Sequence, residues 1–291
     1  MKLATYEING EVKVGVIGND QGKIVPVSAL GYNATEMTEF IREIGGKLPE
    51  EKITAIDAAQ GDLLAQCRLL SPIPQPAQDI LCLGVNYKDH QDETIKAGVA
   101  YDKSKASTIY FGKRLNRAVG PNEYIDGHFN IVDSLDYEVE LAVVIGKDAK
   151  DVAIEDVKNY ILGYTIVNDI SARNLQKKHQ QWYFGKSLDD FTPIGPWIVT
   201  ADEFDGIPQV GIRCYVNGEL RQNSNTKLLI NPIDFVIHEL SQGMTLKAGT
   251  IIATGTPSGV AMGMDPQPWL QAGDVIRCEI DGIGVLENTV K

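Results

Sequence analysis

The chain has 291 residues, of which 43% are hydrophobic and 23% are charged, and its formal net charge is −12 at pH 7. These proportions are typical of a globular protein, and the length is sufficient for one large domain and a small one. An acidic chain without a basic patch excludes nucleic acids and anionic membranes as expected partners, because both attract clusters of Lys and Arg. The first residues, MKLATYE, lack the apolar core of a signal peptide, and no apolar run is long enough to cross a bilayer, so we expect a cytoplasmic protein.

Residues 1–70 are predicted to form a small N-terminal α/β domain. Two β-type runs between residues 6 and 17 flank Asn9-Gly10, a pair that tolerates the positive φ angles of a tight hairpin turn. A helix is expected at 33–44, where apolar residues recur at helical spacing before two glycines. Three prolines at alternate positions within 71–78 then indicate an extended connector, so residues 79–291 are predicted to be a separate, larger domain.

An apolar strand expected at 80–85 leads directly into the polar segment 86–93. If this segment is helical, His90 and Glu93 lie at positions i and i+3 and can touch, which would raise the basicity of the imidazole. The alternative is a solvated helix with an incidental ion pair. Residues 96–107 are rich in Lys, Gly, Ala and Ser, and we expect them to form a mobile loop beside a site.

Two glutamates, Glu138 and Glu140, stand at the start of the apolar run 141–145, which is predicted to be a buried strand. Alternate side chains of a strand share one face, so the two carboxylates should lie close together. Such a pair is unfavourable in a buried position unless a cation neutralises it. The glutamates are therefore either solvated at a wet strand end or ligands of a hard divalent ion such as Mg²⁺ or Mn²⁺.

Asp169 is the candidate third ligand. It follows the apolar strand expected at 163–168, and its carboxylate would join the two glutamates if that strand lies beside the acidic one. The alternative is that Asp169 caps the helix predicted from residue 171 to residue 181. Lys186, which follows a glycine, is either a ligand of a substrate carboxylate or an ordinary exposed lysine.

The C-terminal third is predicted to be rich in β-structure. Hairpins are expected at 210–222 and 275–288, and a helix is expected to run from Asn231 to Gly243. The loop at 254–259 is either a simple tight loop or a source of backbone amides and hydroxyls for an anion. The four cysteines include no Cys-x-x-Cys pair and are expected to be core thiols.

Together these motifs resemble the fumarylacetoacetate hydrolase family, in the family's order and over about residues 70–290. The matching pieces are Gly84-x-Asn86-Tyr87-x-x-His90-x-x-Glu93, Asp136-Tyr137-Glu138-x-Glu140-Leu141, Asn168-Asp169-x-Ser171-Ala172-Arg173-x-x-Gln176, Gly185-Lys186-Ser187, Gly195-Pro196-Trp197 and Thr254-Gly255-Thr256-Pro257-Ser258-Gly259. The resemblance implies an α+β, mainly β fold, with a mixed β-sandwich roll as the catalytic domain. It also implies a homodimer.

The same resemblance assigns roles to the site residues. It implies that Glu138, Glu140 and Asp169 are the ligands of Mg²⁺ or Mn²⁺, and that His90 with Glu93 is the water-activating pair. A small 2-oxo or 2,4-dioxo acid would bind the ion through its keto and carboxylate oxygens. By the family's motif positions, its remaining oxygens would be held by Lys186, Gln176 and Thr256. Arg173 matches a motif position too, as a substrate contact or as part of a structural ion pair.

The implied function is a divalent-metal-dependent hydrolase that cleaves a carbon–carbon bond of an acylpyruvate-type acid and releases pyruvate through an enolate that the metal stabilises. Oxaloacetate decarboxylation and isomerisation of the 2-hydroxyhepta-2,4-diene-1,7-dioate type are alternatives on the same scaffold. A third alternative is a non-catalytic, metal-binding interaction protein. That alternative gives no physical reason for His90, Glu93 and Lys186 to occur together.

Overall fold

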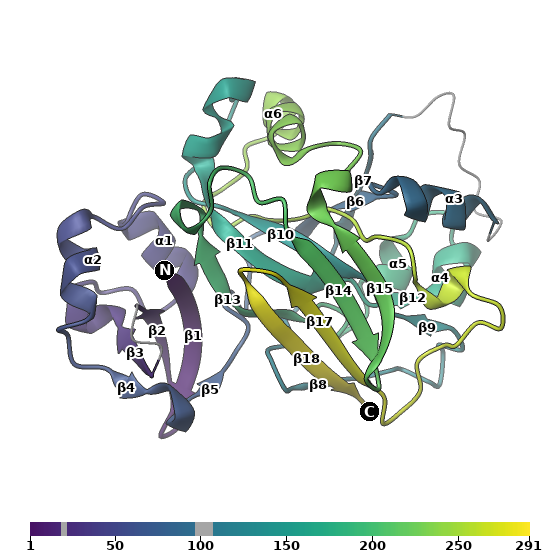
Figure 1. Ribbon diagram of the computed structural model, residues 1–291, viewed down its shortest axis with the longest axis horizontal. Coiled ribbons are helices and arrows are strands. Elements are labelled where there is room, and N and C mark those ends of the chain that lie inside the picture. Colours follow the sequence, from purple (N-terminus) through teal and green to yellow (C-terminus); the bar gives the residue numbers. More distant parts are fainter. Residues whose placement is uncertain (19–21, 97–106) are drawn as a thin grey trace.

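The computed structural model describes residues 1–18, 22–96 and 107–291, and it is built mainly from β-strands (Figure 1). Strands hold 35% of the residues and helices 23%, which confirms the predicted α+β, mainly β class. Most of the loop expected at 96–107 lies outside the described residues.

The larger of the two main sheets has eleven strands. They are β1 (Lys2–Ile8), β2 (Glu11–Ile17), β3 (Lys23–Pro26), β4 (Asp62–Leu63), β5 (Arg68–Leu69), β6 (Ile80–Gly84), β7 (Ile109–Lys113), β10 (Val139–Ile145), β11 (Ile161–Asn168), β13 (Ile194–Thr200) and β16 (Ile251–Ala253). Their order is β4-β3-β2-β1-β13-β11-β10-β16-β6-β7, with β5 beside β1. The long central strands β10 and β11 are buried along their whole length, as their continuous apolar sequences predict.

A second sheet of five strands packs on one face of the first. Its strands, in spatial order, are β15 (Glu219–Asn225), β14 (Gly211–Val216), β17 (Val275–Ile280), β18 (Gly284–Val290) and β8 (Tyr124–Ile125). The core between the sheets includes Leu141 and Val143 of β10 together with Ile212 of β14 and Ile276 of β17. This is the packing of a β-sandwich. A short additional pair joins β9 (Leu135–Asp136) to β12 (Ser171–Ala172).

Side-chain alternation along β10 decides which way the acidic residues point. The odd-numbered residues Leu141 and Val143 face the sandwich core, whereas the even-numbered Ala142 and Val144 belong to a second apolar cluster on the other face. Positions 138 and 140 are also even-numbered, so their side chains belong to the face that the five-stranded sheet does not cover.

Six α-helices occur in the described parts of the chain. They are α1 (Met37–Glu43), α2 (Glu50–Ile56), α3 (Lys88–Lys96), α4 (Arg173–Lys178), α5 (Tyr183–Lys186) and α6 (Ile233–Gly243). Figure 1 shows α1 and α2 beside the N-terminal strands, and α3, α4 and α5 gathered on the far side of the molecule. The helix expected from residue 171 begins only at Arg173, and its N-cap residue is Ala172. The alternative role of Asp169 as a helix cap is therefore wrong.

The N-terminal strands join the rest of the protein through the large sheet itself. Strand β1 pairs with β13, where Lys2 lies opposite Val199 and Leu3 opposite Ile198. The hairpin expected around Asn9-Gly10 is present as β1 and β2. The division into residues 1–70, a connector at 71–78 and a domain at 79–291 stays a prediction about which parts fold independently.

A glycine pair after α1 gives a prediction about how the N-terminal segment is docked. Gly46 has a φ of +82°, and a Cβ atom there would lie 2.9 Å from the backbone of Gly146, whereas a Cβ atom at Gly45, with a φ of +58°, would meet nothing within 4 Å. We expect Gly45→Ala to lower the free energy of unfolding by about 1–2 kcal/mol through backbone strain alone. Gly46→Ala should lower the free energy of unfolding by about 1–3 kcal/mol more than Gly45→Ala does, because its Cβ atom also collides with the Gly146 backbone. Urea unfolding measures the free energy of unfolding of both variants. Equal decreases in the two variants would contradict a tight contact between Gly46 and Gly146.

Candidate metal centre

The buried charged side chains gather at one place in the protein. Among the residues that the structure describes, these side chains are His90, Lys113, Asp136, Glu138, Glu140, Asp169, Arg173 and Lys186. They come from α3, from the end of β7, from the acidic segment before and within β10, from the end of β11, and from α4 and α5. A polar cluster inside a protein is costly unless its charges are paired or bind an ion.

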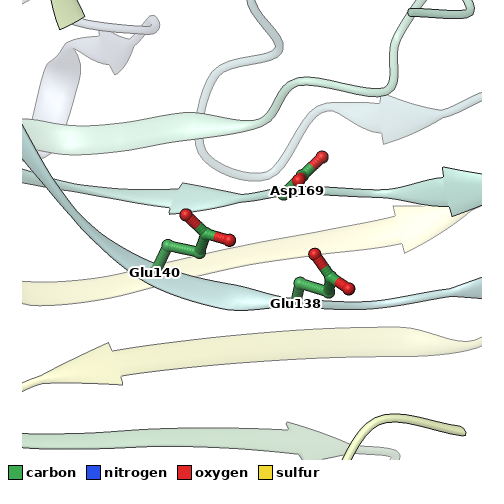
Figure 2. A group of neighbouring side chains, drawn as sticks. All are labelled: Glu138, Glu140 and Asp169. Carbon is green, nitrogen blue, oxygen red and sulfur yellow. The ribbon is translucent and has the colours of Figure 1, made fainter. Parts of the chain in front are cut away.

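Three carboxylates form the centre of this cluster. One ligand oxygen from each of Glu138, Glu140 and Asp169 lies within 4.8 Å of the others, and all three side chains are buried. Figure 2 shows the two glutamates on one segment and Asp169 on its neighbour. The strands β10 and β11 are antiparallel neighbours, with Val139 opposite Asn168, and the Asp169 amide donates to the Glu138 carbonyl at 2.8 Å. The two strands thus lie side by side, as the convergence of the three acids required.

Lys186 lies between two of these acids. Its ammonium donates to Glu138 Oε2 and to Asp169 Oδ2, both at 2.6 Å. Only 2% of the lysine is exposed, so the alternative of an ordinary surface lysine is wrong. Burial alone would lower the pKa of Lys186, but the charges of Asp169 and Glu138 outweigh burial and raise it, so the side chain remains a cation.

Arg173 binds the acidic segment from the other side. Its guanidinium donates to Glu138 Oε1 at 2.5 Å and to Asp136 Oδ2 at 2.9 Å. Burial opposes ionisation of Glu138, but Lys186 and Arg173 together lower its pKa. A structural ion pair, one of the two roles considered for Arg173, is thus present.

Two further charged residues of the cluster were not predicted as site residues. Lys113, at the end of β7, donates to Asp169 Oδ1 at 2.6 Å and to the Ile170 carbonyl at 2.9 Å. Nothing in the sequence around Lys113 connects it with Asp169, because the contact depends on how β7 and β11 are placed. Asp136 could have been predicted as a member of the cluster, because it lies two residues before Glu138 and alternates with Glu138 and Glu140 along the same extended segment.

Glu140 forms no ion pair within the described part of the chain. Its Oε2 accepts a hydrogen bond from the Gly255 amide at 2.8 Å. Burial, followed by the charges of Asp169 and Glu138, raises the pKa of Glu140 well above its usual range. The cluster contains four buried carboxyl groups but only three permanently cationic side chains, so one carboxyl group is left without a cationic partner. Buried carboxyl oxygens that a divalent ion could neutralise suit Mg²⁺ or Mn²⁺, so the residues present fit such an ion.

His90 and Glu93 form the contact that their spacing predicted. His90 Nδ1 lies 2.9 Å from Glu93 Oε2, and the other oxygen, Oε1, accepts a hydrogen bond from the Gly259 amide at 3.0 Å. The side chains are only 7% and 13% exposed, so the alternative of a solvated surface pair is wrong. Two amides of the loop at 254–259 therefore bind the protein's own carboxylates, Glu140 and Glu93.

His90, Glu138 and Glu140 line one small pocket of about 30 Å³, which has room for an ion or a few waters. Gln176 and Thr256 also line it. Gln176 Oε1 accepts a hydrogen bond from Arg173 at 3.0 Å, and the Thr256 hydroxyl donates to the Val139 carbonyl at 2.9 Å. The proposed substrate contacts of Gln176 and Thr256 stay predictions.

Comparison with known proteins identifies the family. The model of the fumarylacetoacetate (FAA) hydrolase C-terminal region matches residues 79–291. The chain belongs to the fumarylacetoacetate hydrolase family. It is 43% identical to oxaloacetate tautomerase YisK of Bacillus subtilis, with 100% of each chain covered.

No helix in the described ranges combines the length and apolar character needed to cross a membrane.

Solved structures of the family share the whole fold. A fumarylacetoacetate hydrolase from the psychrophile Exiguobacterium antarcticum is 38% identical, with a TM-score of 0.85 over 100% of this chain and 99% of that one. Maleylpyruvate hydrolase from Sphingobium sp. SYK-6, solved with manganese(II) and pyruvate, is 30% identical, with a TM-score of 0.78 over 100% of this chain and 98% of that one.

Proposed function

We propose that the protein is a Mg²⁺- or Mn²⁺-dependent oxaloacetate tautomerase, which interconverts the keto and enol forms of this small 2-oxo acid. The observation that carries the proposal is the placement of His90, oriented by Glu93, in the same small pocket as Glu138 and Glu140, two of the three converging carboxylates. The full-length similarity to the Bacillus subtilis oxaloacetate tautomerase supports the choice of substrate and reaction.

Tautomerisation moves one proton between C3 and the keto oxygen, so it needs one acid–base group and no attacking water. His90 Nδ1 is held in a hydrogen bond with Glu93. The other ring nitrogen, Nε2, would therefore exchange the proton with the substrate. The divalent ion, when bound to Glu138, Glu140 and Asp169, would supply a Lewis acid that stabilises negative charge on the keto oxygen. Lys186 and Lys113 hold Asp169 in place, and the pocket's small volume limits the water around His90.

Hydrolysis of an acylpyruvate is the second candidate, and the similarity to maleylpyruvate hydrolase favours it. In that reaction His90 would take a proton from an attacking water. Decarboxylation of oxaloacetate needs no attacking water, so it is a further outcome of the same assay. A purely non-catalytic role gives no account of the buried His90–Glu93 pair.

A substrate panel separates these reactions. Protein with Mg²⁺ or Mn²⁺ is mixed with oxaloacetate, acetylpyruvate and fumarylpyruvate, while the ultraviolet absorbance of the enol and the release of pyruvate are followed together. We expect faster enol–keto exchange of oxaloacetate without pyruvate release, compared with an ion-only control. Pyruvate from oxaloacetate would instead indicate a decarboxylase, and pyruvate from the other two a hydrolase. No reaction with any of the three would overturn the enzymatic proposal.

Glu93→Gln should lower the tautomerase rate by about 10–100-fold, the usual cost of losing an orienting partner. The amide keeps the shape of Glu93 and its hydrogen bond from Gly259, but it lacks the charge that stabilises the imidazolium. Steady-state kinetics measure the loss, with the solvent-exposed change Glu155→Gln as a control. A full rate in Glu93→Gln would remove Glu93 from the mechanism.

We also propose that the protein works in the cytoplasm and, from the resemblance to the family, that it is a homodimer. Sedimentation should then give twice the chain mass of 31.8 kDa. A particle of the single-chain mass would contradict the dimer.

A further inference from the structure

A second cavity, of about 540 Å³, lies between the N-terminal segment and the central strands. Its walls come from the start of β1, the turn after α1, the first residues of β11 and the 3₁₀ turn at Ala201–Glu203. Figure 1 shows α1 and the N terminus near this end of the sheet. Asp169 follows the other end of β11, which has 8 residues. Tyr164 is the lining residue of β11 nearest in sequence to Asp169, and at about 3.3 Å per residue the five steps between them span roughly 16 Å.

The floor of this cavity is apolar and firmly packed. Leu3, Leu162 and Tyr164 line it, and each is at most 2% exposed. One wall is fixed by the close contact between Gly46 and the Gly146 backbone, where a Cβ atom would have no room. A preformed cavity of this size, between two parts of a fold, is typical of small-molecule sites, which span about 300–1,000 Å³.

The rim of the cavity is cationic in a protein that is strongly acidic overall. Lys47, Lys147 and Lys158 line it from three separate segments, and Asp202 is the one acid among the described lining residues. Within residues 1–18, 22–96 and 107–291, none of the three lysines forms an ion pair. Lys147 instead lies 4.5 Å above the Tyr160 ring. Three unpaired ammonium groups around an apolar floor complement a ligand that is apolar at one end and negative at the other.

We infer that this cavity binds an organic anion with an apolar body, an aryl or alkyl group carrying a carboxylate or phosphate. The apolar body would lie on Leu162 and Tyr164, and the acid group would meet the three lysines. The cavity is far larger than the pocket at the metal centre, so its ligand is a bulkier molecule than a small oxo acid. The inference does not depend on the reaction at the metal centre.

Fluorescence titration with anilinonaphthalene sulfonate, an aromatic anion, tests the inference on the intact protein with Mg²⁺ present. We expect saturable binding at one site per chain, weakened by about tenfold or more in Lys147→Glu/Lys158→Glu, since two charge-assisted contacts are lost. The double variant Lys178→Glu/Lys227→Glu makes the same charge change on surface helical turns away from the cavity, and it should bind as the unaltered protein does. Ala201→Phe, which fills the cavity without changing charge, should also weaken binding.

Competition identifies the acid group and separates the two pockets. Displacement of the dye by decanoate or by decyl phosphate supports the inference and distinguishes a carboxylate from a phosphate ligand. Binding should survive Glu140→Ala, because that residue belongs to the other pocket. Equal affinity in both lysine double variants, or loss of binding in Glu140→Ala, would overturn the inference.

Discussion

His90→Asn is expected to lower the tautomerase rate by about 10²–10⁴-fold, the usual contribution of a positioned acid–base group. Asparagine retains a polar side chain but cannot exchange a proton near neutral pH. His90 is buried, oriented by Glu93, and lines the same pocket as Glu138 and Glu140. The loss should therefore fall on the rate, while binding of Mn²⁺ changes little.

A second histidine provides a matched control. His238 lies half-buried on α6, where its Nδ1 is 2.7 Å from the Val152 carbonyl, and it does not line the metal-centre pocket. We expect His238→Asn to keep the tautomerase rate. For both variants, enol absorbance gives the tautomerase rate and calorimetry gives the Mn²⁺ affinity. Equal rates in His90→Asn and the unaltered protein would refute the role of His90.

Glu140→Gln should weaken Mn²⁺ binding by about 100-fold or more, because changing even an outer partner of a metal ligand costs about 10–100-fold. Glutamine preserves the volume of Glu140 and can still accept the hydrogen bond from the Gly255 amide. In the absence of metal, the same change should leave the free energy of unfolding unchanged or raise it. Glu140 is a buried acid without a cationic partner, so a neutral amide of the same volume removes no favourable charge contact.

Two measurements distinguish a ligand from a residue that only supports the fold. Calorimetry gives the Mn²⁺ affinity, and urea unfolding without metal gives the stability, with Glu155→Gln as the exposed control. A structural residue would lose stability and keep the affinity. A variant that binds Mn²⁺ as tightly as the unaltered protein would exclude Glu140 from the ion's ligands.

Part of the carboxylate cluster could be predicted, because the relation between Glu138 and Glu140 depends only on residues that are close in the sequence. Alternation along a strand places Glu138 and Glu140 on one face whatever the rest of the fold does. The position of Asp169 beside the two glutamates depends on the pairing of β10 with β11. The sequence alone did not decide between that pairing and a role of Asp169 as a helix cap. The spacing of His90 and Glu93 likewise indicated that they could touch if their segment was helical, whereas their burial depended on the fold.

The cations that hold the cluster could not be predicted from patterns in the sequence. Lys113 meets Asp169 only because β7 ends close to β11, although the two strands lie at different places in the sheet order. Lys186 is buried and bridges two acids, and its contact with a substrate stays a prediction. The second cavity gave no sequence signal either, since its walls come from segments far apart in the chain.

Anomalous diffraction from crystals grown with Mn²⁺ tests the central claim most directly, namely that Glu138, Glu140 and Asp169 together hold a divalent ion. The account predicts a single strong manganese peak in the metal-centre pocket, bonded to one oxygen of each carboxylate. No peak there at saturating Mn²⁺, with the Lys186 ammonium still bridging Glu138 and Asp169 and Glu140 bonded only to the Gly255 amide, would contradict it.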